Sequence, residues 1–303
     1  MSPRPAFSSL PLQKSGPRGN AWGLFGSSDE LGMLNRLTPE NALAASKEIV
    51  YGIRIATDWS LAQPKTPFFW KTGVPSGDQA QGAKDSRSGT DSGILDHKVY
   101  FNGCQQEDIH NSTKNGTHVW VENGGVVGRG VLLDYASWAE SQGLKPSTHT
   151  FTPIPLSNLQ KIVEAQGITF KPADIMFIRT GYIRNTEAMS FEDTNMYATQ
   201  GGGPIPAIGI ESCEEMLRWL WENEFAAIVG DQPSLEAAPF ASTEYCLHGW
   251  MLAGWGMPIG ELFDLEKLAV ECKKYNKYTF FFSSVPLNVL GGVASPPNGV
   301  AIL

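Results

Sequence analysis

The chain has 303 residues, of which 42% are hydrophobic and 11% aromatic, enough to bury the core of one large domain or two ordinary ones. Its formal net charge is −8 and its 23 lysine and arginine residues form no basic run, which argues against nucleic acid or an anionic membrane as a partner. The longest apolar stretches are far shorter than a membrane span, so no membrane partner is expected.

The N-terminal segment, residues 1–21, is expected to be a loose arm. Its opening, MSPRPAFSSLPLQKSG, lacks the apolar core of a signal peptide, which predicts an intracellular, cytoplasmic protein. Residues 22–303 contain no internal repeat and no clear linker, and we take them as a single domain. The cysteines form no C-x-x-C pair and are expected to be reduced thiols: Cys104, Cys213, Cys246 and Cys272.

Helix signals recur along the chain. Thr38 followed by Pro39 predicts an N-cap and first turn that open a helix over 40–50. Capping boxes at Ser157 with Gln160, and at Ser212 with Glu215, predict helices that run to about residues 167 and 223. Asp264 is the predicted cap of a helix over 265–276.

Strand signals lie between these helices at 53–61, 127–135, 174–182, 225–231 and 279–287. Several of these segments are short, continuously apolar runs, which predict strands that are covered on both faces. Residues 62–126 are instead rich in Gly, Ser, Asp, Lys and Gln, which is typical of a long loop or hairpin region. The alternation of strands and helices predicts an α/β fold.

His248 and Glu261 are the first candidates for chemistry. His248 lies on a predicted helix capped by Ser242, and Glu261 follows after Pro258 has ended that helix. Together they would bind a metal or act as acid and base, but the spacing alone favours a core histidine and a surface glutamate.

Polar residues that follow apolar strands are the second group. Asp231 ends the strand at 225–231 and is followed by Ser234 and Glu236, either as part of a site or as a turn that bonds nearby backbone amides. Arg179 follows the apolar residues of the predicted strand at 174–182, either as a clamp for a substrate anion or as a structural partner of an acid such as Asp174.

Several stretches of the chain, in this order, resemble the cyclase superfamily that includes bacterial kynurenine formamidase, and most closely its filamentous-fungal branch. Among them are WGLFGSSDELGMLNRLTPENALAASKEI, HVWVENGGVVGRGVLLDY, ADIMFIRTGY, LHGWMLAGWGMPIGELFDLEKLA and FFFSSVPLNVLGGVASPPNGVAIL. The resemblance covers most of residues 22–303. It implies a swivelling β/β/α domain of the cyclase/kynurenine formamidase type, assembled as a homodimer or tetramer.

The resemblance also implies where a metal would bind. Metal-dependent members carry a His-x-Gly-Thr-His-x-Asp-x-Pro-x-His segment, and a later histidine and glutamate complete a zinc or manganese site. His248 and Glu261 match the later pair. The first segment matches poorly, because SGTDSGILDH at 88–97 places Arg87, Asp91 and Gly93 at ligand positions and only His97 agrees. An arginine opposes cation binding, so we expect no metal cofactor, with zinc or manganese as the alternative.

Gly116-Thr117-His118 spells the core of the same metal motif, yet it follows the YFNG stretch at 100–103, whereas the metal segment of the relatives precedes it. We therefore expect a structural role for this triplet, although His118 can still face the pocket. Trp120 belongs to a segment that carries a tryptophan in the relatives, so it is not a replaced ligand.

These observations favour a metal-independent cyclase or lyase in fungal secondary metabolism that acts on a hydrophobic or aromatic small molecule. The expected reaction is a dehydration, an isomerisation or a cyclisation, pericyclic steps included. The alternatives are a divalent-metal amidohydrolase or lactonase and a non-catalytic small-molecule binder. The expected catalytic residues are His248, Glu261, His97 and Arg179. The expected substrate-binding residues are Phe69, Trp70, Asp91, His118, Trp120, Asp231, Trp250 and Trp255.

Overall fold

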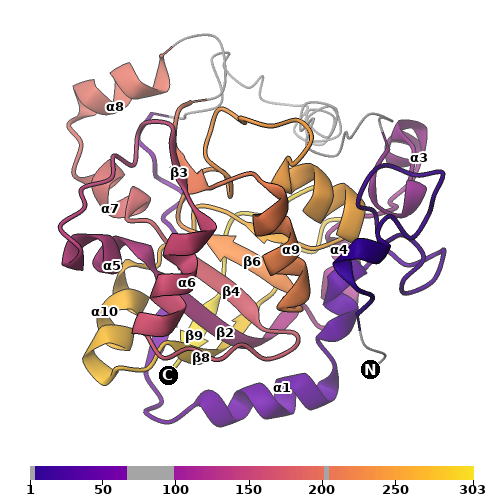
Figure 1. Ribbon diagram of the computed structural model, residues 1–303, viewed down its shortest axis with the longest axis horizontal. Helices are drawn as coiled ribbons and strands as arrows, with labels where there is room; N and C mark the ends of the chain where they lie inside the picture. The colour runs from indigo at the N-terminus through magenta and orange to yellow at the C-terminus, as the bar shows by residue number, and fades with distance from the viewer. Residues whose placement is uncertain (1–3, 67–98, 201–204) are drawn as a thin grey trace.

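A seven-stranded mixed sheet forms the centre of the computed structural model, which describes residues 4–66, 99–200 and 205–303 (Figure 1). The strand order is β1-β9-β8-β2-β4-β6-β7. The strands are β1 (Arg54–Ala56), β2 (Val126–Asp134), β4 (Ile175–Arg179), β6 (Ala227–Gly230), β7 (Ile259–Gly260), β8 (Thr279–Ser284) and β9 (Val300–Ile302). Neighbouring pairs from β2 to β7 are parallel, whereas β8, β9 and β1 extend the sheet in antiparallel pairings. The expected α/β fold is confirmed, and a strand overlaps each of the five predicted runs.

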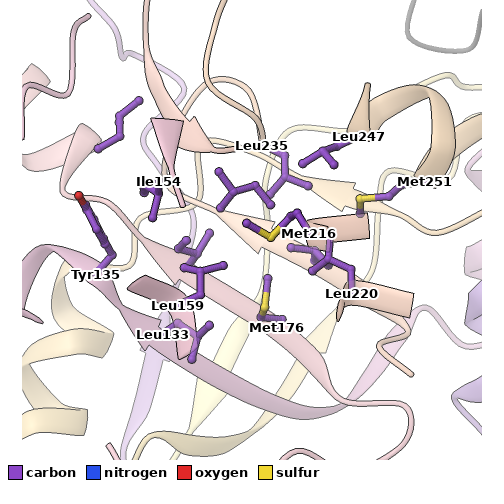
Figure 2. Packing of buried hydrophobic residues seen from close by; sticks show 14 of the residues in the cluster. Leu133, Tyr135, Ile154, Leu159, Met176, Met216, Leu220, Leu235, Leu247 and Met251 are labelled. Carbon is purple, nitrogen blue, oxygen red and sulfur yellow. The ribbon is translucent and has the colours of Figure 1, made fainter. Parts of the chain in front are cut away.

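Two hydrophobic clusters cover the two faces of the sheet. Leu133 and Met176 belong to the first cluster, while their chain neighbours Leu132 and Phe177 belong to the second. Side chains alternate between the faces of a strand, so a stretch buried on both faces must be apolar, as residues 131–133 of β2 and 175–178 of β4 are. Figure 2 shows the first cluster, in which Met216, Leu220 and Leu159 lie close to the sheet.

Helices supply the outer layers. In Figure 1, α6 (Leu156–Ala165) and α9 (Glu214–Glu222) lie in front of the sheet, and their apolar residues join the first cluster. The second cluster includes the buried residues of α10 (Glu266–Tyr275). The remaining α-helices are α1 (Pro39–Ala45), α3 (Gln106–Asn111), α4 (His118–Glu122), α5 (Tyr135–Ser141), α7 (Tyr182–Glu187) and α8 (Phe191–Ala198). A second, two-stranded parallel sheet pairs β3 (Thr152–Ile154) with β5 (Ile208–Ile210).

Two predicted capping boxes do not form. Pro155 is the N-cap of α6, so Ser157 lies inside the helix, and Cys213 is the N-cap of α9. Neither N-cap makes a side-chain hydrogen bond. Thr38 does cap α1, since its side chain accepts from the Asn41 amide, and Asp264 accepts from the Glu266 amide at the start of α10.

Two parts of the expected loop region are described, residues 62–66 and 99–126. The first is irregular as predicted, but the second contains helices α3 and α4, so the prediction of irregular structure is wrong there. Helices of 6 and 5 residues are too short to be stable alone. Long-range contacts hold them: the Asn115 amide donates to Glu30 Oε2 at 2.6 Å, and the Thr117 amide donates to the Gly292 carbonyl at 2.8 Å.

The described part of the N-terminal arm, residues 4–21, is docked on the domain rather than loose. The Arg4 guanidinium donates to the carbonyls of Trp221 at 2.9 Å and Phe225 at 2.8 Å. The Trp221 indole N–H donates to the Pro5 carbonyl at 2.7 Å, and Phe7, in the short helix η1 (Phe7–Ser9), is buried. The arm therefore belongs to the same hydrophobic core as α9.

Across residues 4–66, 99–200 and 205–303, no helix combines the length and the apolar character that crossing a bilayer requires.

His149 is expected to make the stability of the fold dependent on pH. Its Nε2 lies 2.9 Å from Thr186 Oγ1, its Nδ1 lies 3.1 Å from Thr148 Oγ1, and burial lowers its pKa to about 4. The folded state therefore resists protonation that the unfolded chain accepts below about pH 6.5, so stability is lost as the pH falls from there towards 4. We expect a loss of about 2 kcal/mol in the free energy of unfolding between pH 7 and pH 4 from this residue.

Urea unfolding at a series of pH values measures this effect. His149→Phe keeps a ring between Tyr182 and Tyr197 and should flatten the pH dependence between pH 6.5 and 4. An unchanged slope in the variant would show that another group is responsible.

Candidate functional site

Polar side chains follow the carboxyl ends of the four adjacent parallel strands β2, β4, β6 and β7. They are Asp134, Arg179, Asp231 and Glu261, at the edge where ligands bind in open parallel sheets. The four residues do not form one cluster. Arg179 pairs with Asp134, and Asp231 binds backbone amides of the loop that follows β4. Only Glu261 joins the cluster that includes His248.

A carboxylate–imidazole–carboxylate cluster forms the candidate site. His248 Nδ1 lies 2.5 Å from Glu236 Oε2, and His248 Nε2 lies 3.1 Å from Glu261 Oε1. The second oxygen of Glu236 accepts from the His248 backbone amide at 3.2 Å. Glu261 Oε1 also accepts from the Leu235 amide at 2.9 Å. The imidazole is therefore held from both sides, and its plane and position are set by carboxylates from two segments.

Backbone packing positions Glu236. The backbone of Glu236 forms a parallel β-bridge with Ile210 at the end of β5. Gly209 makes that approach possible, because a Cβ added there would stand 2.3 Å from the Glu236 carbonyl carbon. The second, two-stranded sheet thus carries Glu236 to the imidazole.

His248 immediately precedes the π-helical segment η6 (Gly249–Trp255). π-Helical turns are rare and are found frequently at functional sites. Pro258 and the short strand β7 then bring Glu261 back to the ring.

The electrostatics favour a charged imidazole. Burial alone would lower the pKa of His248, but the carboxylates of Glu236 and Glu261 outweigh it and raise the pKa to about 10. Burial alone would raise the pKa of Glu236, whereas the charge and hydrogen bonds of His248 hold it below its ordinary value. Glu236 is completely buried, while the side chain of Glu261 is 30% exposed, so Glu261 is the solvent-facing member of the cluster.

Two further side chains contact the cluster. The Phe240 ring lies 5.4 Å from the imidazole between centroids, at an interplanar angle of 31°, and its residue is 45% exposed. Phe240 therefore supplies an accessible aromatic surface beside His248. The Cys246 thiol lies 3.5 Å from Glu236 Oε1, and burial raises the pKa of this thiol to about 12, so it acts as a neutral donor.

Asp231 is a structural residue. Its Oδ1 accepts from the Thr180 amide at 2.6 Å and from Thr180 Oγ1 at 2.8 Å, and its Oδ2 accepts from the Gly181 amide at 2.8 Å. Burial raises its pKa to about 6 against the opposing effect of these hydrogen bonds. Both carboxylate oxygens are thus used to join the ends of β4 and β6, which does not support the expected substrate contact.

Arg179 is also structural, so its expected role as a substrate clamp is not supported. Its Nη1 donates to Asp134 Oδ1 at 2.7 Å, while Nε and Nη2 donate to the two Glu266 oxygens at 2.9 and 2.5 Å. The partners differ from the Asp174 pairing that the sequence suggested, because Asp174 binds Arg129 at 2.8 Å instead.

The expected aromatic lining is mostly core. Trp255 is completely buried and donates to the Gly19 carbonyl at 2.9 Å, so it cannot line an open pocket. Trp250 is 4% exposed and stacks on Phe7 of the docked arm. Trp120 packs against the second cluster. His118 is buried with Nδ1 accepting from the Gly291 amide at 3.3 Å, which agrees with the structural role expected for the Gly-Thr-His triplet.

The described residues do not by themselves fit a metal. His248 Nε2 and Glu261 provide two donors, and no group of three or more His, Cys, Asp or Glu side chains suited to an ion occurs within the described ranges. A first-row dication needs three or four ligands. The remaining expected site residues lie outside the described residues: Phe69, Trp70, Asp91 and His97.

Sequence reasoning placed His248 and Glu261 correctly side by side but did not select Glu236 for the site. The signal was present, since Glu236 follows the same apolar strand as Asp231. From the sequence, Glu236 could not be ranked above Asp231 as a site residue, because it lies five residues further along the chain with no motif of its own. Only the bridge between Ile210 of β5 and Glu236 shows which of the two acids lies beside His248.

Comparison with known proteins agrees with this architecture. The family model described as "Putative cyclase" matches residues 64–237, more than half of the chain. A solved structure described as a novel cyclase shares 24% sequence identity over 94% of this chain and 100% of that chain, with a TM-score of 0.75, which shows a common fold.

Weaker similarity extends to isatin hydrolase A from Ralstonia solanacearum, with 16% identity over 62% of this chain and 64% of that chain and a TM-score of 0.45. Isatin hydrolase A from Labrenzia aggregata, in a structure with benzyl benzoate, shares 16% identity over 58% of this chain and 60% of that chain, with a TM-score of 0.43. A search of curated proteins found no match.

Proposed function

The chain belongs to the cyclase family, and from this premise we propose that it is a metal-independent cyclase or lyase acting on a hydrophobic or aromatic small molecule. Its chemistry would be dehydration, isomerisation or cyclisation. The resemblance of its sequence to fungal family members supports a role in fungal secondary metabolism. Fold membership alone does not establish a reaction, so the proposal rests on the site.

The observation that carries the proposal is the pairing of His248 with two carboxylates of different exposure. Buried Glu236 holds Nδ1, so the proton available for transfer is on Nε2, which faces the partly exposed Glu261. A positioned acid and base within hydrogen-bonding distance are what proton-transfer catalysis requires.

A dehydration illustrates how the cluster would work. His248 Nε2–H would protonate a departing hydroxyl group, which leaves as water, and Glu261 would remove the proton from the adjacent carbon. The proton on Glu261 then returns to His248 across the 3.1 Å contact, which restores the starting state. Every proton is accounted for within residues of this chain.

Chelation and substitution test the proposal. We expect purified protein, assayed with a panel of aryl β-hydroxyketones, to keep its turnover in EDTA and to lose at least about 100-fold in kcat on His248→Ala. His110→Ala, at an exposed residue of α3, is the matched control and should leave turnover unchanged. Stoichiometric zinc or manganese, together with activity lost to EDTA, would contradict metal independence.

A divalent-metal amidohydrolase or lactonase is the second candidate, and one feature favours it. A histidine that binds a metal through one ring nitrogen usually has its other nitrogen paired with a carboxylate, and Glu236 pairs with Nδ1 of His248 in this way while Nε2 faces the carboxylate of Glu261. The same panel extended to aryl amides and lactones separates the two reactions. If neither reaction occurs with any probe, and substitutions of His248 or Glu261 change no measured rate, a non-catalytic small-molecule binder is the remaining interpretation.

Phe240→Ala is expected to raise KM for an aromatic substrate by about 3- to 10-fold with a smaller change in kcat, because its ring offers the accessible aromatic face beside His248. Steady-state kinetics with whichever aryl probe is turned over measures this effect. Phe151→Ala is a suitable control because Phe151 is 44% exposed, close to the 45% of Phe240. Equal effects from both substitutions would remove Phe240 from the substrate site.

A further inference from the structure

The carboxyl-terminal end of η6 accepts three hydrogen bonds from residues 21–33, which belong to the start of the domain. We call this segment the η6 clamp. The donors and their acceptor carbonyls are Trp22 Nε1 with Ala253 at 2.7 Å, the Ala21 amide with Gly254 at 2.9 Å, and the Met33 amide with Gly256 at 2.9 Å. The clamp therefore contacts the segment that joins the two polar ends of the candidate site.

Pro258 explains why these carbonyls need donors from outside the helix. A helical carbonyl accepts from the amide four residues further on, or five residues further on in a π-helical turn. For Ala253 the first of these residues is Met257, whose amide donates instead to the Met251 carbonyl at 2.8 Å. The second is Pro258, which has no N–H, and Pro258 is also the residue four positions after Gly254. Because buried carbonyls without a partner are costly, the clamp supplies donors that the helix lacks.

The clamp is itself held in place. Asn102 Oδ1 accepts from the Gly23 amide at 2.9 Å, and Asn102 Nδ2 donates to the Gly26 carbonyl at 2.9 Å. Gly32 has a φ of 56°, and a Cβ there would stand 2.1 Å from the Gly256 carbonyl oxygen, so the clamp packs backbone against backbone at this point. The position of the clamp against η6 is therefore fixed.

The segment that the clamp holds is anchored at both ends. His248 immediately precedes η6, and Glu236 binds both its backbone amide and its Nδ1. Beyond η6, the Pro258 carbonyl accepts from the Ile228 amide of β6 at 3.1 Å, three positions before Glu261. Contacts of the clamp between these two anchors act on how the intervening turns are wound.

The winding of η6 determines where the imidazole lies. A π-helical turn is rare and contains more residues than an α-helical turn. If one residue left the turn as it changed to α geometry, the residues before it would rotate by about 100° against those after it. A rotation of this size would move the His248 ring away from Glu261, whose Oε1 now lies 3.1 Å from Nε2.

We propose that the η6 clamp keeps η6 π-helical and thereby holds His248 against Glu261, with Trp22 as a positioning residue of the candidate site. The proposal rests on the proposed function only for its effect on turnover, because the geometry itself is measured without a substrate. Trp22 is the clamp residue to test, since its donor is in the side chain, whereas Ala21 and Met33 donate through the backbone.

Trp22→Phe removes the indole N–H and keeps an aromatic ring. NMR of EDTA-treated protein follows the Nε2 proton of His248, which the contact with Glu261 protects from exchange with solvent. We expect this proton to exchange at least about tenfold faster in the variant. Trp138→Phe is the matched control, because Trp138 is a half-buried tryptophan of α5 that lies beside Tyr135, and it should leave the rate unchanged. An unchanged rate in Trp22→Phe would overturn the proposal.

Steady-state kinetics tests the positioning role with any probe that is turned over. Trp22→Phe should lower kcat by about 10- to 100-fold and change KM by less than about twofold, because it displaces the acid–base pair and leaves Phe240 in place. A higher KM with an unchanged kcat would contradict the proposal. So would an equal loss of kcat in Trp138→Phe, since that would show general loosening of the fold.

Hydrogen exchange in the unmodified protein tests the same connection if Trp22→Phe does not fold. The Trp22 indole N–H and the backbone amides of η6 should exchange at similar rates, because they would become exposed in one opening event. An indole N–H that exchanges at least about tenfold faster than these amides would count against the clamp. If no probe is turned over but the His248 proton responds to Trp22→Phe, the clamp is supported and only the proposed function fails.

Discussion

Replacing Glu236 by glutamine is expected to lower the pKa of the His248 imidazole from about 10 by about two pH units or more. The carboxylate is completely buried and lies 2.5 Å from Nδ1, so its negative charge acts on the ring through a medium with little screening. The amide is nearly the same size and still accepts from the His248 backbone amide, but it carries no charge. In the variant, burial still lowers the pKa of His248, and only the carboxylate of Glu261 remains to raise it.

Titration of the His248 ring protons by NMR, in protein freed of metal with EDTA, measures the pKa directly. Glu140→Gln is a suitable control because Glu140 is a surface residue paired with Arg184. A pKa for His248 that stays near 10 in Glu236→Gln would show that Glu261 alone keeps the ring charged.

The same substitution predicts a change in pH-dependent stability. A histidine whose folded pKa lies above its unfolded value contributes stability that is fully present below about pH 6.5 and is lost as the pH rises through about 10. In Glu236→Gln that loss should occur at lower pH. Urea unfolding between pH 6 and pH 10 measures it, and identical pH profiles for both proteins would contradict the assignment.

Arg179→Met is expected to lower the free energy of unfolding by about 3 to 5 kcal/mol. Asp134 is 2% exposed, and its Oδ1 receives a hydrogen bond from Arg179 Nη1 at 2.7 Å, so the substitution leaves a buried carboxylate without its cation. Glu266 loses two further hydrogen bonds. The sheet and α10 would therefore lose a connection at the end of β4.

Urea or thermal unfolding measures this loss, with Arg184→Met as the control. Arg184 and Glu140 form an exposed pair, so their separation should cost less than about 1 kcal/mol. A substrate clamp would show the opposite behaviour, in which Arg179→Met keeps the stability of the protein and changes only its KM. That result would restore the role expected from the sequence.

The candidate site was partly predictable. His248 and Glu261 lie 13 positions apart with a helix and a proline between them. The resemblance to the cyclase family indicated that they lie side by side, and His248 Nε2 is 3.1 Å from Glu261 Oε1. Glu236 could not be selected in the same way, because its place depends on a two-stranded sheet between segments more than fifty residues apart in the chain. Arg179 was misread for the same reason: an arginine after a strand is equally suited to a ligand or to two buried acids.

The sequence by itself determined the α/β class and the central strands, because a strand covered on both faces must be apolar at every position and helices between such strands must be amphipathic. Local patterns of this kind do not depend on how the helices and strands are arranged in space. The tertiary structure decided which polar groups meet: Glu236 with His248, Arg179 with Asp134, and the N-terminal arm with α9. These pairings depend on contacts between segments distant in the chain, whose cost in chain entropy is offset only when the whole core is assembled.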